Sequence, residues 1–75
     1  MNDLTKQVVE AATPYLSSNA ERFILRQITS HLNATGDQLT TAQLDDLAKW
    51  VEISASLLID KAKAKELSEK ILTFK

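Results

Sequence analysis

The side chains that could take part in chemistry are few in this chain of 75 residues. His31 is its only histidine and it contains no cysteine, so multi-histidine and thiolate metal sites are excluded. A histidine that acts as a general base needs a nucleophile and an orienting partner, and the sequence around His31 offers no spacing that supplies them. We interpret His31 as a residue near a helix C-terminus, where a positive charge is favourable.

Two polar pairs have structural explanations of the same kind. Asp45 and Asp46 lack the alternating acids and the glycine of a calcium-binding loop, and they suit the first turns of a helix. Ser18 and Glu21 fit a capping box at the start of another helix. The single glycine cannot build a phosphate-binding loop. We therefore predict that the protein is not an enzyme, and we expect no catalytic residue, metal ion, cofactor or small-molecule substrate.

Length and composition indicate one small helical domain spanning residues 1–75. Hydrophobic residues make up 44% of the chain and charged residues 25%, which is typical of a folded domain. So short a chain buries only about 60–65% of the surface that its unfolded form exposes, and a partner chain is a natural source of extra stability. The N-terminus lacks the pattern of a signal peptide, and no apolar run approaches the roughly 20 residues of a membrane span. We expect a cytoplasmic protein that does not bind membranes.

Hydrophobic periodicity predicts an all-α fold. We expect a small bundle of three to four helices at about residues 3–12, 19–32, 41–54 and 56–73, the last two being either separate or one long helix. The first helix should either end near Ala12 or be kinked there, because the residue before Pro14 avoids helical dihedral angles. Capping boxes are expected at Ser18 and Thr40, and residues 33–37 between them are expected to form a turn in which Gly36 is free to take a positive φ.

The two C-terminal segments pose a problem of length. An unbroken helix over residues 41–74 would be roughly 50 Å long at 1.5 Å per residue, which is too long for a globule of this size. We therefore favour a break at Ser54, Ser56 or Asp60, whose side chains compete for backbone hydrogen bonds. One apolar stripe in this region is expected to be buried, and it comprises Leu44, Leu47, Ala48, Val51, Ala55, Leu58 and Ala62.

A second apolar stripe, which we call the C-terminal stripe, has heptad spacing. It comprises Trp50, Ile53, Leu57, Ala64, Leu67, Ile71 and Phe74. Aromatic residues anchor many interfaces, because they bury a large area with few rotatable bonds. The stripe predicts a protein-interaction surface made mainly by Trp50, Leu57, Leu67, Ile71 and Phe74. If the stripe is internal instead, residues 57–59 and the face that carries Arg22 and Arg26 are the next candidates.

Residues 47–58, with the sequence LAKWVEISASLL, resemble a helix-turn-helix. On that resemblance Ala48 lies where two helices cross, and Ser54 caps a reading helix. Glu52 stands where the family's turn usually has glycine, and the reading helix would carry no Arg, Asn or Gln to read a base edge. The resemblance implies DNA binding by residues 47–65, with phosphate contacts from Lys61, Lys63 and Lys65.

Two functions from different classes remain. The favoured one is a non-enzymatic helical protein-interaction module, a regulatory or adaptor subunit that acts as a homodimer or binds a larger protein. The alternative is a DNA-binding transcriptional regulator. The formal charge of −1 favours the first, because nucleic-acid-binding domains present a basic surface. Only the segment from Ala55 to Lys75 is basic, with five lysines against three acids.

Overall fold

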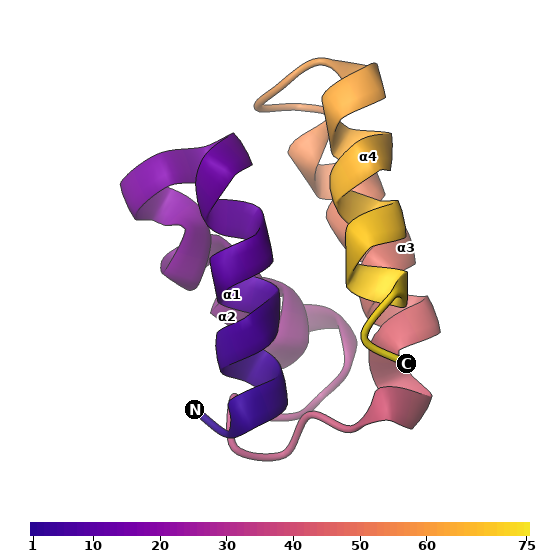
Figure 1. Cartoon of the computed structure of the whole chain (residues 1–75). Coiled ribbons are helices and arrows are strands. Elements are labelled where there is room, and N and C mark those ends of the chain that lie inside the picture. The colour runs from indigo at the N-terminus through magenta and orange to yellow at the C-terminus, as the bar shows by residue number, and fades with distance from the viewer.

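The computed structural model describes all of residues 1–75, and every regular element in it is helical. The elements are α1 (Asp3–Leu16), a 3-10 turn η1 (Ser17–Asn19), α2 (Ala20–His31), a 3-10 turn η2 (Thr41–Gln43), α3 (Leu44–Ala55) and α4 (Lys61–Leu72). Helix α2 packs against α1 and passes obliquely behind it in the view of Figure 1, whereas α3 and α4 lie side by side in opposite directions. The two pairs meet where α1 contacts α4 and α2 contacts α3. The prediction of an all-α chain is therefore confirmed.

One apolar core joins the two helix pairs. It contains 15 buried residues, drawn from all four α-helices and from the connection between α2 and α3. The largest side chains that are completely buried include Ile24, Ile28, Leu44, Leu47, Leu67 and Ile71. No helix is both long and apolar enough to cross a membrane.

Helix α1 continues past the proline that was expected to end it. Pro14 lies in the last turn, where its missing N–H removes one helical hydrogen bond, and the helix ends at Leu16. The hydroxyl of Thr13 donates to the carbonyl of Val9 at 2.9 Å, and the amide of Ser17 donates to the carbonyl of Thr13. Because Leu16 is buried, the added turn gains a core contact. The predicted end at residue 12 was wrong for this reason.

The connection from α1 to α2 also differs from the prediction. The η1 turn leads directly into α2, whose first residue is Ala20, and no side chain caps this helix. The predicted capping box at Ser18 was therefore wrong, because Ser18 lies inside the η1 turn and its side chain accepts no amide of α2. At Thr40 the prediction is confirmed, since the Gln43 side chain accepts the Thr40 amide at 3.0 Å.

Gly36 lies in a closely packed position and does not adopt a positive φ. The positive φ after α2 belongs to Asn33, at 52°, and Gly36 has no positive φ. A Cβ atom on Gly36 would lie 2.8 Å from Leu25 and 3.3 Å from Met1. The Gly36 carbonyl also accepts hydrogen bonds from the Asn2 amide at 2.9 Å and the Thr5 hydroxyl at 2.7 Å. The glycine therefore lets this connection lie against the start of α1.

The expected break in the C-terminal half is present, between Ser56 at the C-terminus of α3 and Asp60 at the N-terminus of α4. The carboxylate of Asp60 accepts the Lys63 amide at 2.8 Å and caps α4. Helix α4 therefore begins at Lys61, later than the predicted residue 56, and the single long helix is excluded. Ser54 does not break the chain, because it lies within α3 and donates to the side chain of Gln27 at 3.1 Å.

Candidate protein-interaction surface

The break divides the C-terminal stripe into parts with different surroundings. Leu67 and Ile71 are 0% exposed and belong to the core, on the buried face of α4. They cannot serve as an accessible surface in this fold, so their assignment to the interaction site is corrected. The heptad spacing was real, but the turn between α3 and α4 reverses the chain and folds this part of the stripe inward.

The two aromatic members of the stripe are half-buried by the chain itself. Phe74 packs against the edge of the core. Trp50 stacks on His31, with ring centroids 3.9 Å apart and planes at 5°. His31 is the last residue of α2, as expected, but its ring covers one face of Trp50. Trp50 and Phe74 therefore have only part of their surface available to a partner.

Leu57 alone among the predicted interaction residues is fully on the outside. It is 84% exposed, and its neighbour Leu58 is 65% exposed. Ile53, on the last turns of α3, is 48% exposed. We call these three exposed side chains, which lie within residues 53–58, the loop surface. Leu58 had been expected in the buried stripe, which instead stops at Ala55, where α3 ends.

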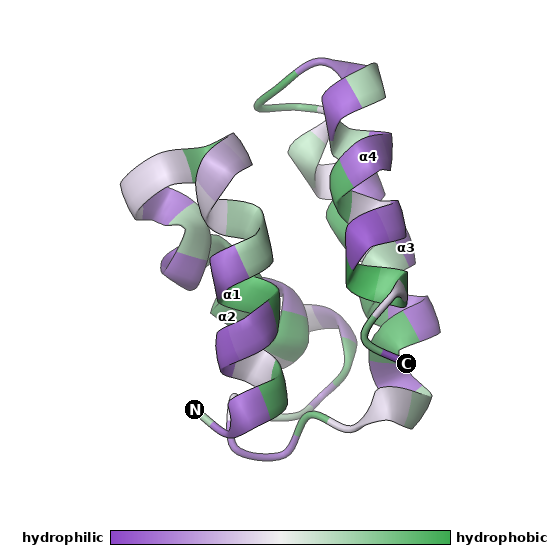
Figure 2. Ribbon diagram, in the orientation of Figure 1, coloured by the Kyte–Doolittle hydropathy of each residue, from purple (hydrophilic) through white to green (hydrophobic).

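The backbone that carries the two leucines is firmly held. The amides of Leu58 and Ile59 both donate to the carbonyl of Ala55, at 2.9 and 2.8 Å, and the amide of Leu57 donates to the carbonyl of Ser54 at 3.2 Å. The Ser56 hydroxyl donates to the carbonyl of Ile53 at 2.7 Å. Ile59 packs against the core, while Leu57 and Leu58 face outward. The connection is a strongly hydrophobic segment between two amphipathic helices (Figure 2). The leucines are thus exposed by an ordered turn.

Three hollows surround this turn. The one that we call the arginine hollow has a volume of about 240 Å³ and is lined by Asn19, Arg22, Phe23, Arg26 and Leu58. Both arginines of the chain lie here, one helical turn apart, and neither forms an ion pair. The sequence placed Arg22 and Arg26 on an outer face of their helix. It gave no signal that Leu58 would close the hollow from the opposite pair of helices.

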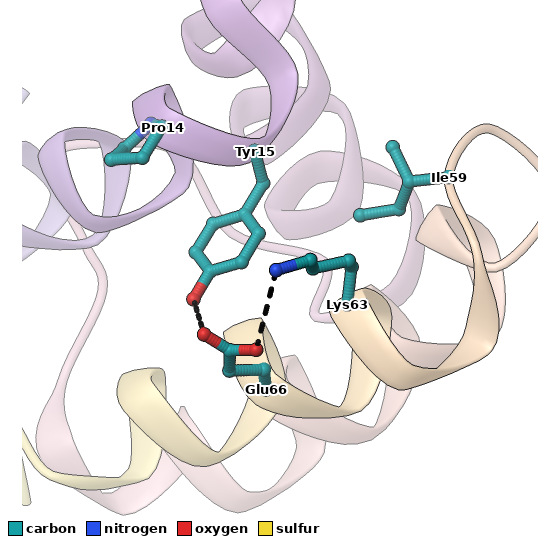
Figure 3. Close-up of a pocket in the computed structure, with 5 residues that line it drawn as sticks. All are labelled: Pro14, Tyr15, Ile59, Lys63 and Glu66. Atoms are coloured by element: carbon teal, nitrogen blue, oxygen red, sulfur yellow. Dashed lines mark hydrogen bonds and ion pairs between the residues drawn. The ribbon is translucent and has the colours of Figure 1, made fainter.

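A second hollow, of about 360 Å³, lies on the α1 side of the turn (Figure 3). Tyr15 reaches across it from α1 and donates its hydroxyl to the Glu66 carboxylate at 2.8 Å. That hydrogen bond is the main cause that raises the pKa of Tyr15 above its ordinary value, with desolvation and the nearby negative charge adding to it. Lys63 stands 3.9 Å from the same carboxylate, and Ile59 forms the opposite wall. This group ties α1 to α4, and it was not predicted because 51 positions separate Tyr15 from Glu66.

The lysines of the alternative interpretation do not form one patch. Lys61, Lys63 and Lys65 are all exposed, but Lys63 lies beside Glu66, and the other two line a third hollow together with Glu52. The helix-turn-helix register is also wrong, because residues 52–55 are helical and α4 starts at Lys61. Helices α3 and α4 lie side by side in opposite directions, whereas a helix-turn-helix crosses its helices steeply (Figure 1).

No protein-family model, curated protein or solved structure matches this chain. Within the structure, no three His, Asp or Glu side chains gather where they could hold a metal ion. The polar groups that do meet, such as Tyr15 with Glu66 and Ser54 with Gln27, satisfy one another across helix contacts. No buried side-chain nitrogen or oxygen is left without a hydrogen-bond partner. The loop surface and the arginine hollow are therefore the features that internal packing does not explain.

Proposed function

We propose that this chain is a small, non-enzymatic, cytoplasmic protein-interaction module that regulates or recruits a larger protein through its loop surface. The observation that carries the proposal is the exposure of two adjacent leucines, Leu57 and Leu58, on a hydrogen-bonded turn. Three of the four large apolar side chains that are exposed in this protein lie within residues 53–58. Single exposed apolar residues are ordinary, but a cluster of this kind marks an interaction site.

Energy and rigidity support the same assignment. Burying a leucine side chain contributes about 1.5–3 kcal/mol relative to leaving it exposed. A partner that covers both Leu57 and Leu58 therefore gains this contribution to its binding free energy from each of them. The ordered turn reduces the entropy lost when the side chains are fixed, which favours association. The core beneath the turn does not depend on these leucines, so they are available to a partner without unfolding the module.

Photo-crosslinking in the cells that make the protein tests this proposal. A photoreactive amino acid placed at Leu57 should yield a protein adduct, because this side chain is the most exposed part of the surface. The same amino acid at Gln7, which is exposed on α1 away from the turn, is the matched control. Adducts at Leu57 that exceed those at Gln7 would support the proposal. Equal labelling at the two positions, or an adduct only with nucleic acid, would contradict it.

A further inference from the structure

The arginine hollow adds charge to the apolar loop surface. Arg22 and Arg26 are exposed on α2, and the hollow between α2 and the loop also contains Phe23 and Leu58 but no acid. The other two hollows beside the turn contain Glu66 or Glu52. This is therefore the one place near the loop where cations accompany apolar side chains with no carboxylate to neutralise them.

We propose that the arginine hollow binds an acidic amphipathic helix of the partner protein, with an apolar side chain between Phe23 and Leu58 and carboxylates on Arg22 and Arg26. This inference rests on the proposed function and names the chemistry of the partner. Guanidinium groups bind carboxylates through paired, charge-assisted hydrogen bonds, which gives both strength and orientation. Phe23 and Leu58 supply the apolar part of the recognition.

The geometry favours a helical partner. Arg22 and Arg26 are one turn apart on α2, which separates their backbone positions by roughly 6 Å along the axis. Two acids at positions i and i+4 of a helix that lies along α2 have the same separation, and the residue between them can point into the hollow. Binding by β-strand addition is excluded, because this protein has no strand whose edge a peptide could extend.

Charge argues against a second copy of this chain as the occupant. In a twofold contact centred on the arginine hollow, Arg22 and Arg26 of one copy would face the same arginines of the other. Four unpaired guanidinium groups would then be brought together without an acid between them, which is unfavourable. The hollows on the other sides of the turn contain Glu52 and Glu66, which an anionic membrane would repel, whereas one helix needs to touch only the arginine hollow.

Selection from a phage-displayed library of random helical peptides tests this inference, with the intact chain as the bait. Enriched peptides should carry two Asp or Glu residues about one turn apart beside a leucine or an aromatic residue. The Arg22→Gln/Arg26→Gln variant should bind the leading peptide more weakly by about tenfold or more, which corresponds to losing one charge-assisted hydrogen bond. The Lys6→Gln/Lys70→Gln variant loses the same charge from exposed positions outside all the hollows, and it should bind nearly as well as the native chain.

The other outcomes separate this inference from the function on which it rests. Peptides that depend on Leu57 but bind equally well to the arginine variant would overturn the acidic partner and leave the protein-interaction role intact. An absence of any enriched peptide would contradict both. Vesicles of phosphatidylglycerol and phosphatidylcholine provide a further comparison, and native chain that sediments with them while binding no peptide would identify a lipid surface instead. Light scattering that shows a dimer, lost on Leu58→Ser, would identify a second copy.

Discussion

The imidazole of His31 lies flat on the indole of Trp50, with ring centroids 3.9 Å apart and planes at 5°. This contact links the last residue of α2 to the middle of α3, across the boundary between the two helix pairs. The two residues had separate expected roles, one at a helix terminus and one in an interaction stripe. In the structure they form a single contact that covers one face of the tryptophan.

Replacing His31 with alanine should lower the free energy of unfolding by about 0.5–1.5 kcal/mol, the usual contribution of an aromatic pair. Trp50 is the only tryptophan, so its fluorescence can follow both unfolding and the loss of the stack. Urea denaturation should show a lower midpoint and a changed native emission. Ser30→Ala, at the exposed neighbouring position, is the control and should leave the emission unchanged. Native emission that is identical in His31→Ala and the parent chain would show that the rings do not stack.

The single tyrosine offers a measurement of pH dependence. The hydrogen bond to Glu66 raises the pKa of Tyr15, so the folded state holds this proton more tightly than the unfolded state does. The stabilising contribution should be complete below the ordinary tyrosine pKa of about 10 and should be lost as the pH rises through the raised value. Ultraviolet absorbance of tyrosinate follows the titration directly. Glu66→Gln should move the midpoint down, Glu69→Gln should not, and coincident curves for native chain and Glu66→Gln would contradict the contact.

Removing the side chain at the start of α4 should lower stability, whereas removing the one before α2 should not. Asp60→Ala removes the side chain that accepts the Lys63 amide, and it should cost about 0.5–2 kcal/mol of stability. Ser18→Ala should cost little, because α2 follows the η1 turn with no side-chain cap. Thermal denaturation followed by circular dichroism compares the two. A larger loss for Ser18→Ala than for Asp60→Ala would show that α2 starts with a conventional cap.

Ser17 is held in an unfavourable backbone conformation, with φ of 56° and ψ of −135°. Glycine adopts such angles without the steric cost that a Cβ atom brings, which is about 1–3 kcal/mol for residues of this kind. Part of that gain is offset by the greater freedom of glycine in the unfolded chain. Ser17→Gly should therefore raise the melting temperature, while Ser30→Gly, within α2, should lower it. A lower melting temperature for Ser17→Gly would indicate a different path from α1 to α2.

Much of the fold follows from local pattern. Apolar spacing places the helices, and the length of residues 41–74 requires the break that lies between Ala55 and Lys61. The extension of α1 through Pro14 could not be predicted from propensity, because it depends on the burial of Leu16 against other helices. The burial of the C-terminal stripe likewise depends on tertiary packing and not on local pattern. Periodicity groups Leu57 with Leu67, but only the path of the turn decides that one is exposed and the other is core.

The candidate site was predictable in part. Residues 57–59 and the arginine face were both recognisable as alternatives to the stripe, because one is a short apolar run and the other lies away from the buried face of its helix. That Leu58 and Arg26 line one hollow depends on the packing of α2 against α3, which no local sequence signal encodes. The contacts of Tyr15 with Glu66 and of His31 with Trp50 have the same tertiary origin.

The most direct test of the loop surface compares the same substitution at an exposed and a buried leucine. Leu57→Glu should keep the helical circular dichroism and the melting temperature close to those of the native chain, because the side chain is 84% exposed. It should also abolish the protein adduct formed by a photoreactive residue at Leu58. Leu67→Glu should lose the helical signal, since it places an unpaired charge at a position that is 0% exposed. An adduct that persists in Leu57→Glu, or a Leu67→Glu chain that stays folded, would contradict the division of the C-terminal stripe into surface and core.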